Sequence, residues 1–311
     1  MNIKRVLGSI KNLISEKEYG ELAKKIINGL TFGYGRAELA HNIAYLRLKK
    51  KYRAFIADYV RTHTHHDRPK GHKDIIWWLW YQGVDEAPDI CKACLASLRR
   101  WHPEKEIITL DKNNISQYIT FPEHIYRKHE QGIIDNTKYS NLIRLQLLIQ
   151  YGGTWIDSTI FCTGRKFEHI MHLPLFLFRE EHFFTNIVSQ FMVSDPDDPI
   201  LQLTRDLHYE YWKEHDYLMD YYIIHMFFKM ATEAYQQEWD SVPVIMSDVH
   251  LAILMAVAAG ERYSEERMKY FASISDFHKF SWKIHESRLW NMPSGYSVHI
   301  IDEYKKGLQQ Q

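Results

Sequence analysis

The chain has 311 residues, 45% of them hydrophobic, and it carries 39 Lys+Arg against 39 Asp+Glu. A chain of this length and apolar content can bury one large core or two modest ones, which excludes a largely disordered protein. No run of about 18 apolar residues occurs, so no segment is predicted to span a membrane. Three cysteines are too few for a disulfide framework, and the amino end lacks the pattern of a signal peptide. We therefore expect a cytoplasmic protein.

The charges are divided unequally between two parts of the chain. Residues 1–73 contain 16 Lys+Arg against 6 Asp+Glu, whereas residues 74–311 contain 23 Lys+Arg against 33 Asp+Glu. Apolar residues at helical spacing in the first part predict a basic helical extension and linker, followed by a domain over the second part. Such an extension could make a peripheral contact with the inner face of the cytoplasmic membrane, or pack on the acidic remainder of its own chain. No nucleic-acid partner is predicted.

From residue 74 onward, strand patterns alternate with helical patterns. The runs "DIIWWLWY", "KEIITL" and "TWIDSTIFC" are typical of strands, the last of them over residues 154–162. Helical spacing occurs in "APDICKACLASLRRWH", "FPEHIYRKHEQG" and "NTKYSNLIRLQLLIQYGG", and Gly152 is predicted to end the third helix. This alternation predicts an α/β fold with a Rossmann-like, mostly parallel sheet flanked by helices. Ligands are then expected beyond the carboxyl ends of the strands.

The third predicted strand contains a single carboxylate, Asp157, among apolar neighbours. In an extended strand, Trp155, Asp157 and Thr159 lie on one face. Because burying a lone carboxylate costs several kcal/mol unless it is paired or binds a cation, we expect Asp157 at a strand end with a partner. Gly153 is expected to let the backbone pass close to whatever Asp157 holds.

On the preceding helix, Ser140, Asn141 and Arg144 lie at positions i, i+1 and i+4, so Arg144 is one turn beyond the other two on nearly the same face. A guanidinium and a carboxylate at one crevice suit a phosphorylated ligand with a divalent metal, because a diphosphate needs neutralisation and hard cations prefer oxygen ligands. The structural alternative is an Arg144–Asp157 salt bridge that only closes the corner between helix and strand.

The stretch "YSNLIRLQLLIQYGGTWIDSTI" resembles the "SDxxRxxxLxxxGGxWxD" signature of the capsular polysaccharide synthesis family of bacterial glycosyltransferases, which are relatives of the DXD-type sugar transferases. The resemblance spans roughly residues 74 to 285, and it also includes "DIIWWLWYQG", "APDICKACLASLRRWHPEKEIITLD", "DYLMDYYIIHMFF" and "FHKFSWK". It implies a GT-A fold and a nucleotide-sugar donor, a UDP- or GDP-sugar. It further implies a glycan or lipid-linked glycan acceptor and a Mn²⁺ or Mg²⁺ ion on the donor diphosphate.

By position, the resemblance assigns roles to particular residues. Asp157 matches the first Asp of the metal motif, Thr159 stands where relatives have the second, and Arg144 matches an arginine that contacts the donor. Asn141 stands where relatives have an Asp before that arginine, and Asp220 falls where the family places polar residues toward the sugar or acceptor. The candidate catalytic residues are Asp157, Arg144, Asn141 and Asp220, and the candidate metal ligands are Asp157 and Thr159. The candidate donor-binding residues are Trp77, Trp80, Gln82, Gly83, Ser140, Gly153, Tyr221, His278, Lys279, Trp282 and Lys283.

The relatives that share the motif are retaining enzymes, in which the departing phosphate oxygen takes the proton of the acceptor hydroxyl. Since Asn141 cannot act as a base, the resemblance implies transfer with retention, with Asp220 or Glu181 as the alternative base. Two other functions stay open from the sequence. One is a sugar-phosphate transferase of polysaccharide assembly, and the other is a catalytically silent binding or scaffold protein with a decayed metal site.

Overall fold

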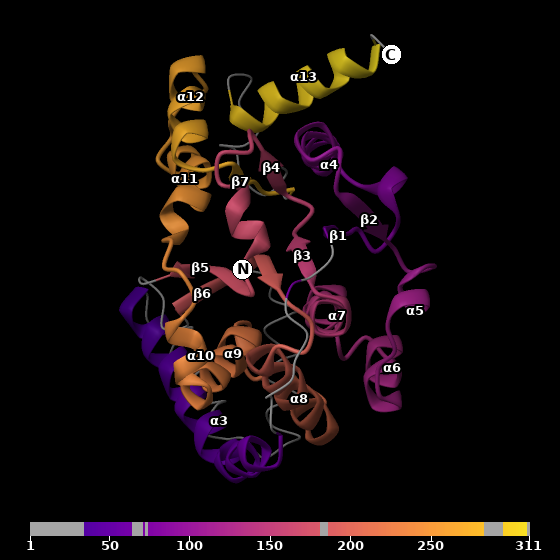
Figure 1. Cartoon of the computed structure of the whole chain (residues 1–311), viewed down its shortest axis with the longest axis vertical. Coiled ribbons are helices and arrows are strands. Elements are labelled where there is room, and N and C mark those ends of the chain that lie inside the picture. The colour runs from indigo at the N-terminus through magenta and orange to yellow at the C-terminus, as the bar shows by residue number, and fades with distance from the viewer. Residues whose placement is uncertain (1–33, 64–70, 72–73, 181–185, 283–294, 310–311) are drawn as a thin grey trace.

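The computed structural model of the chain describes residues 34–63, 71, 74–180, 186–282 and 295–309 (Figure 1). Within them, the central sheet consists of β1 (Ile75–Leu79), β2 (Glu106–Leu110), β3 (Gly153–Ile156), β5 (Leu175–Glu180) and β6 (Asn186–Ser194). A two-stranded sheet consists of β4 (Ile160–Cys162) and β7 (Phe277–Lys279). The helices are α3 (Tyr34–Thr62), α4 (Asp89–Trp101), α5 (Ile115–Tyr118), α6 (Glu123–Glu130), α7 (Asn136–Tyr151), α8 (Pro199–Glu214), α9 (Ile223–Ala234), α10 (Gln236–Asp240), α11 (Ser247–Ala258), α12 (Glu265–Ile274) and α13 (Tyr296–Gln309). No helix in this part of the chain has the length and apolar content needed to cross a membrane.

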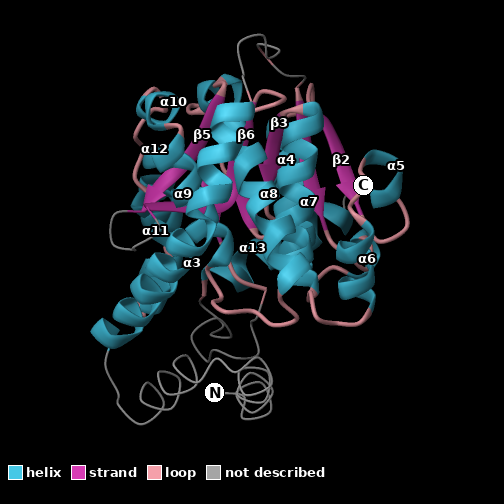
Figure 2. Cartoon of the chain, turned by 90° about the horizontal axis from the view of Figure 1, so that it is seen from below, coloured by secondary structure: helices cyan, strands magenta, loops and turns pink. Residues whose placement is uncertain are grey.

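Most strands of the central sheet point in the same direction. The strand order is β2-β1-β3-β6-β5, in which β1 pairs in parallel with both β2 and β3. Strand β6 is antiparallel to β3 on one side and to β5 on the other, so β5 again runs with the first three. Figure 2 shows the helices gathered around these strands. The predicted fold class, an α/β fold with a mostly parallel sheet flanked by helices, is confirmed.

The sheet separates two hydrophobic cores because its side chains alternate between the two faces. On β1, Trp77 belongs to the core shared with α7, α8 and α9, whereas Trp78 belongs to the core shared with α4 and α11. On β3, Trp155 and Ile156 divide in the same way. All four side chains are buried. Burial of aromatic rings on both faces stabilises the β1–β3 pair and so fixes where their carboxyl ends lie.

Residues 154–162, predicted as one strand, form two strands in different sheets. Strand β3 ends at Ile156, a turn follows, and β4 begins at Ile160 and pairs with β7. The Ile160 N–H closes the turn by donating to the Asp157 carbonyl at 3.0 Å. The turn places the Asp157 carboxylate at the strand end, whereas a continued strand would keep this charge among buried apolar side chains. Because the strand ends at Ile156, strand alternation does not place Thr159 on the same face as Trp155 and Asp157, as the sequence had predicted.

Helix α3 packs on the rest of the chain, as the indigo helix beside α8 and α9 in Figure 1 shows. Two ion pairs join it to these helices, with Lys49 Nζ 2.7 Å from Glu233 and Lys51 Nζ 2.8 Å from Glu214. Its residues in the core shared with α8 and α9 are Ala44, Tyr45, Leu48, Tyr52 and Tyr59. Of the two interpretations of the basic extension, packing on its own chain therefore describes α3. The domain boundary after residue 73 stays a prediction.

Gly153 lets β3 approach β1 closely. Its φ is +96°, and a Cβ at this position would lie 2.7 Å from the carbonyl oxygen of Ile75. Cβ atoms do not come so near to a backbone oxygen, so a larger residue would push the strands apart. Gly153 lies at the amino end of β3, away from Asp157. In this position, Gly153 allows the close approach of β3 to β1.

Replacing Gly153 by alanine should destabilise the fold by about 3 kcal/mol, because the left-handed φ and the backbone clash both oppose a Cβ. The matched control is Gly132→Ala, where φ is +72° but a Cβ would meet nothing within 4 Å. Only the backbone contribution of about 1–2 kcal/mol then remains. Urea denaturation of both variants measures the difference. Equal losses would show that the approach of β3 to β1 does not require a glycine.

Candidate active site

Asp157 lies at the carboxyl end of β3, where the chain leaves the central sheet. Its backbone N–H donates to the carbonyl of Gln190 on β6 at 2.9 Å, next to the last residue pair of the β3–β6 ladder. Its side chain is 23% exposed, so the carboxylate borders solvent. Because β1 and β3 are parallel neighbours, the carboxyl end of β1 lies at the same edge. The expected placement of this carboxylate at a strand end is confirmed.

Three donors surround the Asp157 carboxylate. Trp155 Nε1 donates to Oδ1 at 2.9 Å, and the Arg144 guanidinium lies 3.3 Å from the same oxygen. Lys279 Nζ lies 3.5 Å from Oδ2. Burial raises the pKa of Asp157, but the charges of Arg144 and Lys279 outweigh it, so the pKa lies below its ordinary value. With an ionised carboxylate between two cations, this centre has a net positive charge.

Arg144 is held by groups from several elements. It comes from α7, is 5% exposed, and donates to the backbone carbonyl of Ser189 on β6. Its guanidinium lies 4.9 Å from the centre of the Trp155 ring on β3. Burial lowers the pKa of Arg144, and the Asp157 charge opposes this shift. The guanidinium is thus fixed in one orientation, with one terminal nitrogen on the Ser189 carbonyl and the other beside Asp157.

Asp157 and Thr159, the two predicted metal ligands, face the same cation. Lys279 Nζ donates to Thr159 Oγ1 at 2.5 Å and lies 3.5 Å from Asp157 Oδ2. The two oxygens therefore converge on one point, and carboxylate and hydroxyl oxygens are the ligands that a hard divalent ion prefers. These residues fit a Mn²⁺ or Mg²⁺ ion provided that the Lys279 ammonium leaves this point, since two cations repel each other there.

Two tryptophans pair beyond the ends of β1 and β7. Trp80 follows β1, and Trp282 comes three residues after the end of β7. Their ring centroids are 5.6 Å apart at an interplanar angle of 88°, and Trp282 is 46% exposed. The predicted residues Gln82 and Gly83 lie in the turn after Trp80, where Gly83 has a φ of +101°. The structure therefore groups these four predicted donor-binding residues in the segments that follow the two strands.

A further polar group lies where α3 meets the segment before α9. Asp220 Oδ2 is 2.6 Å from His41 Nδ1, and Asp220 Oδ1 accepts a hydrogen bond from the Tyr222 N–H at 2.8 Å. The neighbouring Tyr221 is exposed, and Lys138 Nζ at the start of α7 lies 4.3 Å from the centre of its ring. Because His41 belongs to α3, the first part of the chain contributes directly to the surroundings of a predicted site residue.

His225 lies between this group and Arg144. Burial and the Arg144 charge lower the pKa of His225 to about 4, and Asp220 opposes the shift. Its Nε2 is 3.4 Å from the Ser189 hydroxyl. Sequence reasoning missed His41, Ser189 and His225. His41 falls in the segment assigned to the extension, and Ser189 contacts Arg144 through its backbone carbonyl, which no side-chain pattern reveals.

Three predicted donor-binding residues lie apart from these groups. Trp77 is buried in the core, where its Nε1 donates to the Gly152 carbonyl at 2.9 Å. Gly153 is at the amino end of β3. His278 is buried and lies 3.1 Å from Thr163 Oγ1, because strand alternation sends it to the opposite side from Lys279. Burial lowers the pKa of His278 to about 4, so the ring is neutral at pH 7.

The remaining predicted residues are on α7 or outside the described part of the chain. Ser140 is partly buried and its hydroxyl donates to the Thr137 carbonyl of its own helix. Asn141 is buried one turn before Arg144. Lys283 and Glu181 lie outside the described residues.

The family described as "Capsular polysaccharide synthesis protein" matches residues 31–299 of this chain. The chain belongs to this family. The match is longer at both ends than the span of residues 74 to 285 over which the sequence resemblance was drawn, and it includes all of α3. Helix α3 is thus part of what the chain shares with the capsular polysaccharide synthesis family.

The individual proteins and solved structures that are similar to the chain share low sequence identity with it. The O-glycosyltransferase braB of Annulohypoxylon truncatum is 29% identical over 104 residues, which are 30% of this chain and 24% of that protein. The chain thus spans about a quarter of the length of this relative. Among solved structures, the PaToxG glycosyltransferase shares 13% identity at a TM-score of 0.37, with 86% of this chain and 96% of that chain covered. The apo-form glycosyltransferase GlyE of Streptococcus pneumoniae TIGR4 shares 10% identity at a TM-score of 0.37, with 76% and 64% covered.

Replacing Asp157 by asparagine in this member of the capsular polysaccharide synthesis family should lower the free energy of unfolding by about 3 kcal/mol, because Arg144 then keeps a buried charge without its counterion. Lys279→Met is the control, since it removes a cation and leaves the Arg144–Asp157 pair intact. Its effect should stay below about 1 kcal/mol. Chemical denaturation measures both. If the two substitutions had equal effects, Arg144 would not depend on the Asp157 carboxylate.

Proposed function

We propose that the chain is a retaining, metal-dependent glycosyltransferase of capsular or lipopolysaccharide-type polysaccharide synthesis. It would move a sugar from a UDP- or GDP-sugar to a glycan or lipid-linked glycan acceptor. The observation that carries the proposal is the approach of both Arg144 and Lys279 to Asp157 at the carboxyl end of β3. Sheets of this kind bind ligands at that edge, and a net positive centre there matches a diphosphate. Membership of the capsular polysaccharide synthesis family supports a sugar as the transferred group.

Arg144 and Lys279 have different tasks in this proposal. Arg144 is buried and fixed, so its fork holds one phosphate and stabilises the charge that develops as the bond to the sugar breaks. Lys279 is on the short strand β7 and moves from Asp157 and Thr159 to the arriving phosphates. Asp157 and Thr159 would then hold a Mn²⁺ or Mg²⁺ ion, which would supply further neutralisation of the diphosphate.

In this proposal, the tryptophans near Asp157 contact the nucleotide base of the donor, and Asp220 contacts the sugar or the acceptor. Trp80 and Trp282 receive the nucleotide base, because an exposed indole ring offers an apolar face for stacking. Asp220 orients a hydroxyl of the sugar or acceptor. Both of its oxygens already accept hydrogen bonds, one from His41 and one from the backbone, which supports an orienting role over that of a general base.

The proposal includes a peripheral contact of residues 1–73 with the inner face of the cytoplasmic membrane. Within α3, Leu39 and Leu46 are exposed on the helix surface, and the exposed Lys50 and Arg53 follow Leu46 at helical spacing. Apolar side chains beside cations on one helix suit an anionic lipid surface. Residues 1–33 are outside the described part of the chain.

Nucleotides and nucleotide sugars should bind the purified chain, and Mn²⁺ should strengthen their binding. A ligand present at about 100 times its Kd stabilises the folded state by about 2.7 kcal/mol, which a thermal-shift panel of UDP, GDP and their sugars detects. Arg144→Lys should weaken donor binding by about tenfold, because a point charge replaces a planar two-pronged donor. Isothermal titration with and without Mn²⁺ measures this loss.

The matched control for that substitution is Arg267→Lys. Arg267 on α12 makes a two-pronged contact with a carboxylate, Glu261, at 2.8 and 3.1 Å. Its replacement should leave donor affinity unchanged. Unaltered affinity and turnover in Arg144→Lys would mean that Arg144 and Asp157 form only a structural salt bridge. Donor binding without any sugar transfer would favour the catalytically silent alternative.

Transfer should proceed with retention, giving an α-linked product from an α-linked nucleotide sugar. Asn141 offers no base near Arg144, so the acceptor hydroxyl has to give its proton to the departing phosphate oxygen on the same face of the sugar. Proton NMR of the anomeric signal of the product measures the outcome. A β-linked product would exclude this mechanism and assign the base role to a carboxylate such as Asp220.

A further inference from the structure

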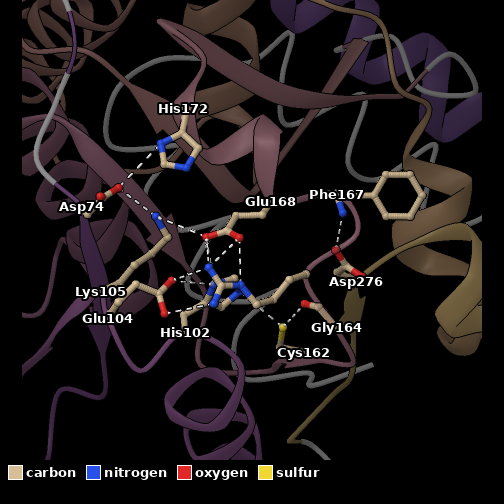
Figure 3. Close-up of polar contacts among 11 residues, drawn as sticks. Asp74, His102, Glu104, Lys105, Cys162, Gly164, Phe167, Glu168, His172 and Asp276 are labelled. Carbon is tan, nitrogen blue, oxygen red and sulfur yellow. Dashed lines mark hydrogen bonds and ion pairs between the residues drawn. The ribbon is translucent and has the colours of Figure 1, made fainter.

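Figure 3 shows a second polar cluster, around His102, Glu104 and Glu168. His102 follows α4, Glu104 lies in the connection from α4 to β2, and Glu168 begins a short 3-10 helix. Lys105, directly before β2, has its Nζ 3.9 Å from Glu168. The cluster therefore gathers at the amino ends of the parallel strands, whereas Asp157 is at their carboxyl ends.

His102 directs a buried nitrogen at both glutamates. The His102 side chain is fully buried, and its Nδ1 lies 3.7 Å from Glu168 Oε1 and 4.0 Å from Glu104 Oε1. Ligand atoms of the three residues all lie within 4.8 Å of one another. Among the described residues, Nδ1 has no hydrogen-bond partner. A buried polar atom left in this way is unfavourable unless something else occupies the space in front of it.

The opposite side of the imidazole ring determines which nitrogen carries the proton. The Cys162 thiol donates to the Gly164 carbonyl at 3.3 Å, so the sulfur carries its proton. His102 Nε2 is 3.6 Å from the same sulfur and is therefore the donor in that contact. With the proton on Nε2, the neutral ring directs the lone pair of Nδ1 at the two glutamates.

Three electron-pair donors therefore face one another, namely the Nδ1 lone pair of His102 and the carboxylates of Glu104 and Glu168. Arg165 holds the two carboxylates together with hydrogen bonds of 2.8 and 2.9 Å to Glu168 and of 2.8 and 3.2 Å to Glu104. The ion pairs of the cluster join Asp74, Glu104 and Glu168 to Lys105 and Arg165, and His172 Nδ1 also lies 3.6 Å from Asp74. Apart from the histidines, three carboxylates face two cations, which favours a further cation.

We propose that His102, Glu104 and Glu168 bind a divalent transition-metal ion of the Zn²⁺ class. An imidazole nitrogen with two carboxylates is a ligand set that Zn²⁺ accepts, whereas Mg²⁺ and Ca²⁺ prefer oxygen ligands alone. In a tetrahedral site with bonds of about 2.1 Å, ligand atoms are about 3.4 Å apart. The present separations are slightly larger, so each side chain needs to shift by only about 1 Å, and water completes the coordination.

The surroundings match those of a metal-binding histidine. Such a histidine donates its other ring N–H to a neighbouring acceptor, which fixes the tautomer and the ring orientation, and the Cys162 sulfur does this for His102. The ion joins the end of α4, the start of β2 and the 3-10 helix Glu168–His172, so its binding stabilises the fold. This site is separate from Asp157 and does not depend on the proposed function.

Chelator-treated full-length chain, free of nucleotide, should bind one Zn²⁺ per molecule in isothermal titration and melt at a higher temperature when ZnCl₂ is added. Glu168→Gln and Glu104→Gln should each weaken this binding by more than about tenfold, because an amide oxygen is a poor replacement for a carboxylate ligand. The matched control is Glu106→Gln, which makes the same chemical change at an exposed position of β2. It should bind Zn²⁺ as the unaltered chain does.

Two further measurements assign the ion to this cluster. Asp157→Asn removes the carboxylate of the other candidate metal site and should leave Zn²⁺ affinity unchanged. Co²⁺ in place of Zn²⁺ should give visible absorption of a nitrogen–oxygen site without the near-ultraviolet band of a bound thiolate. The proposal is wrong if the unaltered chain binds no Zn²⁺, if the Glu168 and Glu104 variants bind it normally, if Asp157→Asn abolishes binding, or if a thiolate band develops.

Discussion

The buried charge of Arg144 is the constraint on which the candidate active site depends. A guanidinium removed from water needs compensation, and the Asp157 carboxylate, the Ser189 carbonyl and the Trp155 ring provide it. These three partners come from β3, its end and β6, so one charge fixes α7 against two neighbouring strands. The same contacts keep Asp157 ionised and near Lys279, which gives this edge of the sheet its positive character.

The parallel sheet separates two polar clusters with opposite excess charge. At the carboxyl ends of the strands, two cations face Asp157. At the amino ends, His102 Nδ1 faces Glu104 and Glu168, and three carboxylates pair with two cations apart from the histidines. At both clusters, the excess charge favours binding of a ligand of the opposite sign. We infer an anion with its metal at the first edge and a transition-metal ion at the second.

Helices and strands were predicted correctly from the sequence wherever residue spacing and a terminating residue indicated the same element. Helical spacing and the φ of +67° at Gly152 agree on where α7 ends, and the runs "DIIWWLWY" and "KEIITL" form β1 and β2 as predicted. The run over residues 154–162 failed because apolar spacing alone cannot show that a strand changes sheets. Its two halves are both buried, but β4 pairs with β7, more than a hundred residues away in the sequence.

From residue spacing alone, the candidate site was predictable only where its residues are close in the sequence, whereas Lys279, Trp80 and Trp282 entered through the family resemblance. Arg144 and Asp157 are thirteen positions apart, on a helix and the strand that follows it, so helix and strand geometry nearly determine their meeting. The contacts that balance each charge are instead made by backbone groups or by residues far away in the sequence. Ser189 holds Arg144 through a backbone carbonyl, which every residue type offers, and His41 reaches Asp220 across 179 positions. Such contacts exist only after α3, α9 and β6 have packed. For this reason the sequence indicates which residues carry charge, while the folded chain determines how each charge is balanced.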